Sequence, residues 1–373
     1  MYKRCIFGAV VTLILLVGCK NNSNVPATGI EIDYTGFQAK PLPTDSILKK
    51  VQVIVPETTD SSLIGNIIRL RMYRDILYVL DSDSHILAFD GTGKCVMRLH
   101  NIGNGPWEYL NVKDFDIDES DGTIFLLADD NLLKYSQDGK FVEKMDVAID
   151  YDAGLAVTND YIYIERNTYS DDGEAEFNIS VIKRKDNSVT EILPTLPEYA
   201  PGCNHATSGI CRTGENVWFT RKFDPKIYRL ADGEVHEWLS MNFGDGFYIP
   251  EADEKLDCSE LFSKTRKEKN IYKIGNVTST DSTCLFTTSL GNCGVVYINN
   301  RDVQIFPSFT DKASGMISAI QKPVSAQIPT VAFVMPASNL KIMATISGNR
   351  EIEKLSTELN EESNPLFFIY ELK

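Results

Sequence analysis

Two clusters of acidic residues carry the side chains in this sequence that best suit metal binding. One is Asp81-Ser82-Asp83, and the other runs from Asp114 to Gly122. Closely spaced carboxylate oxygens are the ligands that calcium prefers. The second segment is not an EF-hand loop, because Ser120 interrupts the acidic alternation and Gly122 falls one position late. The alternative is that these aspartates accept hydrogen bonds from the backbone of turns. No metal site is therefore predicted, and calcium is the cofactor that these clusters would suit.

The heptapeptide Gly103-Asn104-Gly105-Pro106-Trp107-Glu108-Tyr109, called the 103–109 loop, combines turn-forming residues with groups that bind ligands. Its glycines and proline shape a tight turn. Aromatic rings beside a carboxylate suit a sugar or a peptide, because they offer both stacking and hydrogen bonding. We therefore predict Trp107, Glu108 and Tyr109 as ligand-binding residues. The alternative is that Trp107 and Tyr109 pack between structural units while Glu108 caps a turn.

Histidines are few, and none lies in a catalytic motif. They are His85, His100, His205 and His236. The chain has no H-E-x-x-H, no G-x-S-x-G nucleophile elbow, no phosphate-binding P-loop and no dinucleotide fingerprint. His205 lies in a polar loop between Cys203 and Cys211, and it joins the predicted ligand-binding residues. A Ser-His-Asp triad assembles from distant positions, so the sequence assigns no catalytic residue.

Six cysteines follow residue 19, namely Cys95, Cys203, Cys211, Cys258, Cys284 and Cys293. Their spacing is irregular and lacks C-x-x-C, so neither a zinc knuckle nor a thioredoxin motif is indicated. An exported protein permits a disulfide between Cys203 and Cys211. The alternative, buried free thiols in strands, suits Cys95 and Cys284 better.

The elements that must position these residues are short β-strands, because apolar residues recur with a period of two between turn residues. Residues 75–97 and 122–143 resemble each other. Each stretch has an apolar strand that ends in Asp, a polar turn, a strand that ends in an aromatic residue, a Gly-Lys turn and a last strand. Aligning Phe89 with Tyr135 gives a period of 46 residues. A four-stranded repeat of ~40–50 residues is typical of a β-propeller blade.

Weaker copies of this repeat occupy residues 155–191, 209–239, 274–306 and 317–373. The six units predict an all-β fold, a six-bladed β-propeller. A lone strand at residues 51–55 is expected to complete the last blade, which would close the ring and remove open sheet edges. Two short helical insertions are expected, at residues 250–269 and 349–362.

The first 18 residues have the features of an export signal. Lys3 and Arg4 precede an apolar run over residues 5–17, which is shorter than the ~20 residues that span a bilayer. Leu16-Val17-Gly18-Cys19 has the form of a lipobox, so we predict cleavage before Cys19 and lipidation of that cysteine. Two acyl chains give stable membrane anchoring. The alternative is an ordinary signal peptide followed by a chance cysteine.

The residue after Cys19 is Lys20, not the aspartate that typically retains lipoproteins in the inner membrane. We therefore predict the outer membrane, with the periplasmic or cell-surface side unassigned. The polar, turn-rich residues that follow suit a flexible tether. The predicted organisation is a signal peptide at 1–18, a lipidated tether at 19–45 and a propeller domain at 46–373.

The charge balance excludes one class of partner. Removal of the signal loses Lys3 and Arg4 and leaves 35 basic against 52 acidic residues. Such an acidic chain repels phosphate backbones and anionic headgroups, so nucleic acid is excluded as a predicted partner. A hydrophobic fraction of 43% is ordinary for a globular protein with a sizeable core.

The 103–109 loop and the segment Asp114-Phe115-Asp116-Ile117-Asp118 resemble the G-x-G-P-G-E-Y … D-F-x-I-D signature of a known family. This family comprises six-bladed β-propeller lipoproteins of Gram-negative gut anaerobes, which are related in architecture to NHL-type propellers. Residues 364–373 are similar to its typical C-terminus, and the resemblance covers residues 50–373. Trp107 stands where the family usually has Gly. The resemblance implies a fold and a location, and it implies no reaction.

These observations favour a binding or scaffold module at the outer membrane, held to lipid through Cys19. Its ligand or partner would be an extracytoplasmic glycan, a peptide or an outer-membrane protein. The alternative is a propeller hydrolase or lyase with a site at the mouth of the central channel, with or without a metal. Residues at the centre of the ring distinguish the two hypotheses. Converging histidines or carboxylates would favour the enzyme, whereas an apolar or arginine-lined centre would favour binding.

Overall fold

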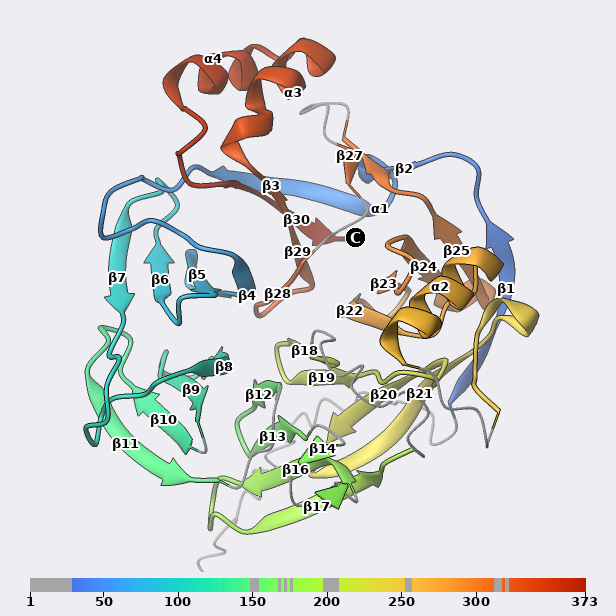
Figure 1. The fold of residues 1–373 in the computed structure, drawn as a ribbon, viewed down its shortest axis with the longest axis horizontal. Coiled ribbons are helices and arrows are strands. Elements are labelled where there is room, and N and C mark those ends of the chain that lie inside the picture. The colour runs from blue at the N-terminus through green and yellow to red at the C-terminus, as the bar shows by residue number, and fades with distance from the viewer. Residues whose placement is uncertain are drawn as a thin grey trace, which may run out of the picture.

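The protein is a ring of curled β-sheets through which the chain proceeds in order (Figure 1). The computed structural model describes residues 29–129, 131–147, 154–166, 169–170, 173–174, 177–196, 208–251, 257–311, 317–318 and 322–373. The fold is mostly β and propeller-like, as the period-two pattern predicts. Cys19, Cys203 and His205 lie outside the described residues.

The largest antiparallel units share one design, in which four successive strands run from the ring centre outward. Two of them are separate sheets. The first contains β8 (Val112–Ile117), β9 (Ile124–Ala128), β10 (Asn131–Tyr135) and β11 (Phe141–Asp146). The second contains β12 (Leu155–Val157), β13 (Tyr161–Glu165), β16 (Phe177–Lys183) and β17 (Val189–Pro194). A small hairpin, β14 (Tyr169–Ser170) and β15 (Gly173–Glu174), lies between β13 and β16 in sequence.

An eight-stranded sheet joins the end of the chain to its beginning. One half contains β4 (Ile67–Tyr73), β5 (Ile76–Asp81), β6 (Ile86–Phe89) and β7 (Cys95–Leu99). The other half contains β28 (Lys322–Ser325), β29 (Thr330–Met335), β30 (Leu366–Leu372) and β3 (Leu48–Ile54). Parallel pairing of β28 with β4 connects the two halves. β3 pairs antiparallel with β30, so the strand expected at residues 51–55 does complete the last antiparallel unit.

A nine-stranded sheet contains two further antiparallel units and one strand from the N-terminal region. The first unit has β18 (Ile210–Thr213), β19 (Asn216–Phe219), β20 (Lys226–Ala231) and β21 (Glu234–Asn242). The second has β22 (Ile274–Ser279), β23 (Thr283–Thr288), β24 (Cys293–Tyr297) and β25 (Asp302–Phe306). Between their outer strands lies β1 (Ile30–Phe37), which pairs parallel with both β21 and β25.

β1 changes the boundary that the sequence suggested between tether and domain. Residues 19–45 were expected to be tether, but the fold begins at Ile30. Burial alternates along β1 and Ile32 is fully buried. A short sheet of β2 (Leu42–Pro43), β26 (Phe309–Thr310) and β27 (Ile317–Ser318) and the helix α1 (Thr44–Ile47) continue the packed region. The reason is that β1 covers the edges of β21 and β25, which would otherwise leave backbone groups unpaired.

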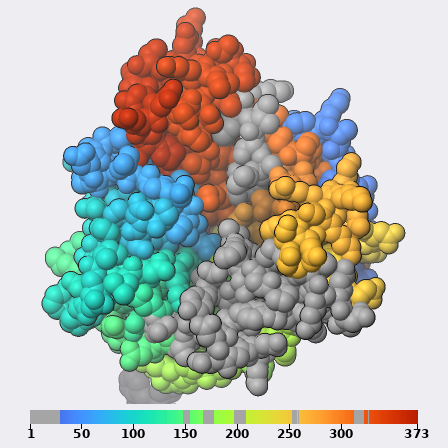
Figure 2. Space-filling view, viewed as in Figure 1, coloured from blue at the N-terminus to red at the C-terminus, as the bar shows by residue number. Residues whose placement is uncertain are grey.

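The longer helices are insertions between successive strands. α2 (Cys258–Glu268) lies within the first expected insertion, and a capping box between Asp257 and Glu260 begins it. α4 (Arg350–Glu358) lies within the second, after α3 (Leu340–Ser347), which the sequence did not predict. Together α3 and α4 form a red lobe that projects from the ring (Figure 2). Short 3₁₀ turns occur at Gly244–Gly246, Ile298–Asn300 and Ala337–Asn339. Among the described helices, none has the length and apolar character needed to cross a bilayer.

Burial follows the position of each strand in its unit. β6 and β9 are buried at every residue, whereas β11 at the rim is almost wholly exposed. Strands covered on both faces need continuous apolar sequence, which matches Ile86-Leu87-Ala88-Phe89. Phe89 and Tyr135, which define the 46-residue period, both end the third strand of their units. Buried apolar strands such as β6 and β9 therefore support the inner strands of their units.

Candidate functional site

The 103–109 loop connects β7 to β8 and is fixed by its own hydrogen bonds. Gly103 N donates to the Tyr109 carbonyl and Tyr109 N donates to the Asn101 carbonyl, each at 3.0 Å. Gly105 N donates to Glu108 Oε2 at 2.8 Å. A Cβ at Gly103 would lie 2.0 Å from Glu108 Oε2, so any other residue at position 103 would displace the carboxylate from this position. Glu108 therefore shapes the loop.

The structure separates the three predicted ligand-binding residues of this loop. Tyr109 is 1% exposed, and its hydroxyl donates to the Ser84 carbonyl at 3.4 Å. Burial raises the pKa of Tyr109. Trp107 is 51% exposed, while its carbonyl accepts a hydrogen bond from Tyr135 Oη at 2.6 Å. Tyr109 thus belongs to the core, and Trp107 is the side chain that the loop presents to solvent.

The carboxylates of the D-F-x-I-D segment lie on the inner strand β8 and bind arginines of other inner strands. Asp114 receives Arg69 Nε at 2.9 Å and Arg69 Nη2 at 3.0 Å, a bidentate pair. Leu155 N of β12 donates to the same carboxylate at 2.8 Å. Asp114 therefore connects three inner strands, β4, β8 and β12.

Asp116 repeats this arrangement two residues further along. Arg71 Nε donates to its Oδ1 at 2.8 Å, and Arg212 Nε of β18 donates to its Oδ2 at 2.6 Å. Val157 N of β12 also donates to Asp116 Oδ2, at 2.8 Å. Burial alone would raise the pKa of Asp116, but Arg212 and Arg71 hold it below its usual value. The carboxylate is consequently ionised and fully engaged at neutral pH.

A less buried group of charges lies where the inner strands begin. Glu165, at the end of β13, accepts Ser208 Oγ at 2.6 Å and Gly209 N at 2.8 Å. Burial raises the pKa of Glu165, and Lys273 acts against that rise. Burial lowers the pKa of Lys273, and Glu165 again opposes the shift. Lys322 begins β28 and donates to the Ile67 carbonyl at 3.2 Å.

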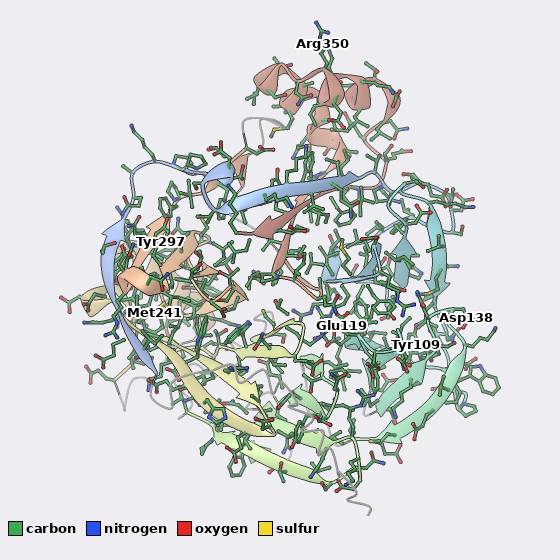
Figure 3. All side chains as sticks on the ribbon, turned by 180° about the vertical axis from the view of Figure 1, so that it is seen from behind. Tyr109, Glu119, Asp138, Met241, Tyr297 and Arg350 are labelled. Atoms are coloured by element: carbon green, nitrogen blue, oxygen red, sulfur yellow. The ribbon has the colours of Figure 1, made fainter. Side chains whose placement is uncertain are left out.

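These basic and acidic residues form a cluster at the ring centre that we call the axial cluster. Its members are Arg69, Arg71, Asp114, Asp116, Glu119, Glu165, Arg212, Lys273 and Lys322. Glu119, which receives Arg212 Nη1 at 3.3 Å, lies close to the centre, while Tyr109 and Asp138 lie nearer the rim (Figure 3). Sequence reasoning missed the basic members, because isolated Arg and Lys residues match no motif. The available signal was spacing, since each Arg–Asp pair from β4 to β8 is separated by 45 residues.

The acidic clusters that suggested calcium have protein partners instead. Asp81, Asp83 and His85 bring ligand atoms within 4.8 Å of one another. However, the Asp81 carboxylate already accepts N–H groups of Gly65, Asp83 and His85 at 2.9–3.0 Å. Arg98 Nη2 lies 3.2 Å from His85 Nε2, and this positive group opposes a cation. In this structure the carboxylates of Asp81, Asp114 and Asp116 therefore accept hydrogen bonds from groups of the protein itself.

Four of the described cysteines carry free thiols. Cys211, Cys284 and Cys293 are buried, and Cys95 is partly exposed. Cys211 and Cys284 lie on inner and second strands, β18 and β23. Burial raises the pKa of Cys293 to about 12, so its thiol is protonated and unreactive at neutral pH. Cys211 is a free thiol here, and Cys203, its expected disulfide partner, lies outside the described residues. The alternative of a buried free thiol holds for Cys284.

Two solved structures share this architecture over nearly their whole length. One is described as a putative exported protein of Bacteroides fragilis NCTC 9343; its TM-score is 0.70 at 19% identity, over 92% of this chain and 99% of that chain. The other is a member of the DUF4221 family from Bacteroides vulgatus ATCC 8482, with a TM-score of 0.52 at 9% identity, over 87% and 98%. Such identities show the fold alone. Among curated proteins, none matches this chain. The family model Domain of unknown function (DUF4934) matches residues 29–371, and the chain belongs to this family.

Proposed function

We propose that the protein is an outer-membrane lipoprotein, anchored through Cys19, whose six-bladed propeller binds an extracytoplasmic glycan, peptide or protein. The export signal and lipobox of the sequence support the anchor. The exported protein of B. fragilis, which shares the fold, supports an extracytoplasmic location. The family resemblance noted from the 103–109 loop supports the same assignment.

Six blades account for the packing of the described residues. The two four-stranded sheets count as one blade each. The eight-stranded sheet counts as two blades, and the nine-stranded sheet counts as two blades that share β1. Buried apolar clusters then lie between consecutive blades, as where Tyr78 of β5 meets Leu126 of β9. The cluster that contains Val324 of β28 and Leu70 of β4 joins the last blade to the first. Each interface buries apolar area on both sides, which is the stabilising term of a closed ring.

The observation that carries the binding function is the exposed indole of Trp107 on a rigid loop. Trp107 has exposed apolar neighbours in sequence, Ile102 at 43% and Leu110 at 57%. Backbone hydrogen bonds on both sides of Trp107 fix its position. A residue whose backbone is already fixed loses less conformational entropy on binding than one on a flexible loop, and tryptophan is enriched at binding hot spots. The loop is therefore preorganised for a ligand with a flat apolar face.

The centre of the ring favours binding over catalysis. General acid–base chemistry needs a carboxylate or histidine that is free to exchange a proton. Asp114 and Asp116 are instead bound by arginines and backbone amides. The centre therefore contains both arginines and carboxylates, and it is the pairing of Asp114 and Asp116 with arginines that supports a binding module over the hydrolase or lyase alternative.

Trp107→Ala tests the proposed function in the purified full-length protein. Ligands are first identified on arrays of bacterial glycans and peptides, and affinities are then measured by titration calorimetry. W107A is expected to weaken binding at least tenfold, since a hot-spot truncation costs ~2 kcal/mol or more. Val189→Ala, at a residue that is 60% exposed on β17, is the control and should bind normally. Equal affinity of W107A and wild type would refute the role of the loop.

A further inference from the structure

The beginning of β28 holds a lysine that has no carboxylate partner within the described part of the chain. Lys322 Nζ donates to the Ile67 carbonyl at 3.2 Å, a neutral acceptor. Its side chain is only partly exposed. Burial lowers the pKa of Lys322, and the Arg69 guanidinium lowers it further. The ammonium group therefore lies near a second cation, and among the described residues it has no compensating charge.

The neighbouring charges of the axial cluster are already compensated. Arg69 is neutralised by its bidentate contact with Asp114. Lys273 and Glu165 attract each other, and the Glu165 carboxylate also receives Ser208 and Gly209. Among the described members of the cluster, one positive charge, that of Lys322, remains. In addition, Arg69 uses only Nε and Nη2 toward Asp114, which leaves its Nη1 without a partner among the described residues.

A half-buried cation without a counter-charge is costly, because desolvation of the ammonium is not repaid by a charged hydrogen bond. We infer that Lys322 and Arg69 bind a singly charged oxyanion, either a carboxylate or a sulfate ester, on a ligand at the ring centre. A single negative charge matches the single uncompensated positive charge. The acidic surface of the protein, with a net charge of −15, keeps unspecific anions away, so the site selects a ligand that also makes other contacts.

This site is separate from the 103–109 loop, because its residues lie on the inner strands β4 and β28, whereas Trp107 belongs to the connection that leaves the outer strand β7. The inference therefore stands or fails independently of the function proposed for Trp107. A ligand that reaches both would carry an anionic group and an apolar face.

Thermal unfolding of the full-length protein tests the inference at constant ionic strength. Sodium glucuronate supplies a carboxylate, glucose 6-sulfate supplies a sulfate ester, and glucose is the neutral probe. At least one anionic probe is expected to raise the melting temperature of wild type in a concentration-dependent way, as ligands of the native state do, whereas glucose should raise it less. The probe that acts identifies which of the two oxyanions the site takes.

Lys322→Met removes the charge and keeps the chain length. K322M is expected to melt at or above the wild-type temperature without an anion, and to bind the active probe at least tenfold more weakly. Lys341→Met, at an exposed residue of α3, should respond like wild type. The inference would be overturned if K322M and wild type responded equally to the anion, or if wild type responded to neither anion. A lower melting temperature of K322M in the absence of anion would show a structural role and would also overturn it.

Discussion

Asp116→Asn removes the charge at the centre of the axial cluster while it nearly preserves shape. The Asp116 carboxylate receives four donors, which are Arg71 Nε, Val157 N and two nitrogens of Arg212, at 2.6–3.0 Å. An amide offers a single acceptor oxygen, so part of this set loses its acceptor. Arg71 and Arg212 are 3% and 2% exposed, and water cannot take over. Removing one partner of a buried pair costs ~3–5 kcal/mol, which is a large part of the ~5–15 kcal/mol that stabilises a native protein.

Urea unfolding followed by tryptophan fluorescence measures this loss. Trp218 and Trp238 are 5% and 8% exposed with ring centroids 4.1 Å apart, so unfolding changes their environment. The D116N midpoint should fall sharply. Asp138→Asn is the matched control, because Asp138 lies at an exposed turn where it pairs with Lys140, and its midpoint should hardly move. If the two variants shift alike, the buried ionic network does not stabilise the ring and the reasoning fails.

The difference between wild type and D116N should also depend on pH. The native pKa of Asp116 is depressed, so its contribution is fully present above the unfolded value of ~3.9. It is lost as the pH falls through the lower native pKa. The gap in the free energy of unfolding should therefore be constant at neutral pH and close in acid. A gap that widens on acidification would contradict the depressed pKa.

Two further predictions concern the ring closure and the anchor. Gly93→Ala should lower the free energy of unfolding by ~1–3 kcal/mol more than Gly291→Ala in the same urea assay. Both glycines have positive φ, but only at Gly93 would a Cβ lie 1.9 Å from the Val55 carbonyl oxygen. Equal losses of stability would show that the contact at Gly93 relaxes freely. Cys19→Ser should release the protein from the membrane fraction and abolish acyl labelling, whereas Cys5→Ser, within the signal, should leave both unchanged. Retention of label in C19S would disprove the lipidation site.

The repeated strands could be predicted from the sequence because they depend on local patterns. Period-two alternation and a 46-residue spacing located β5, β6, β9 and β10, and the strand at residues 51–55 proved to be part of β3. These signals work because each antiparallel strand pairs with its neighbour in sequence. The order of strands around the ring then follows from chain order.

β1 was missed although Ile30-Glu31-Ile32-Asp33 alternates clearly. Its partners, β21 and β25, are far away in sequence, and parallel pairing across such a distance leaves no mark in the local pattern. In the sequence, a strand that directly follows a polar tether therefore looks like a continuation of that tether. The outer edges of β21 and β25, which β1 covers within the nine-stranded sheet, explain why this segment is ordered.

The axial cluster was missed for a different reason. Arg69 and Arg71 alternate along β4 as Asp114 and Asp116 do along β8, so each pair lies on one face of its strand. The repeat period would have placed these faces opposite each other. The contact of Arg212 with Asp116 joins strands two units apart and depends on side-chain length across the ring centre, which no periodicity encodes.

The motif residues of the 103–109 loop and of residues 114–118 have structural roles in this chain. Glu108 folds over Gly103 and Gly105, Tyr109 fills the core, and Asp114 and Asp116 hold the inner strands together. Substitution of these residues should disturb stability before it disturbs any ligand. Trp107, which departs from the signature, is the residue that faces solvent. In this chain the motif residues therefore stabilise the ring, whereas the two ligand contacts that we propose, Trp107 on the loop and Lys322 at the centre, have no such role.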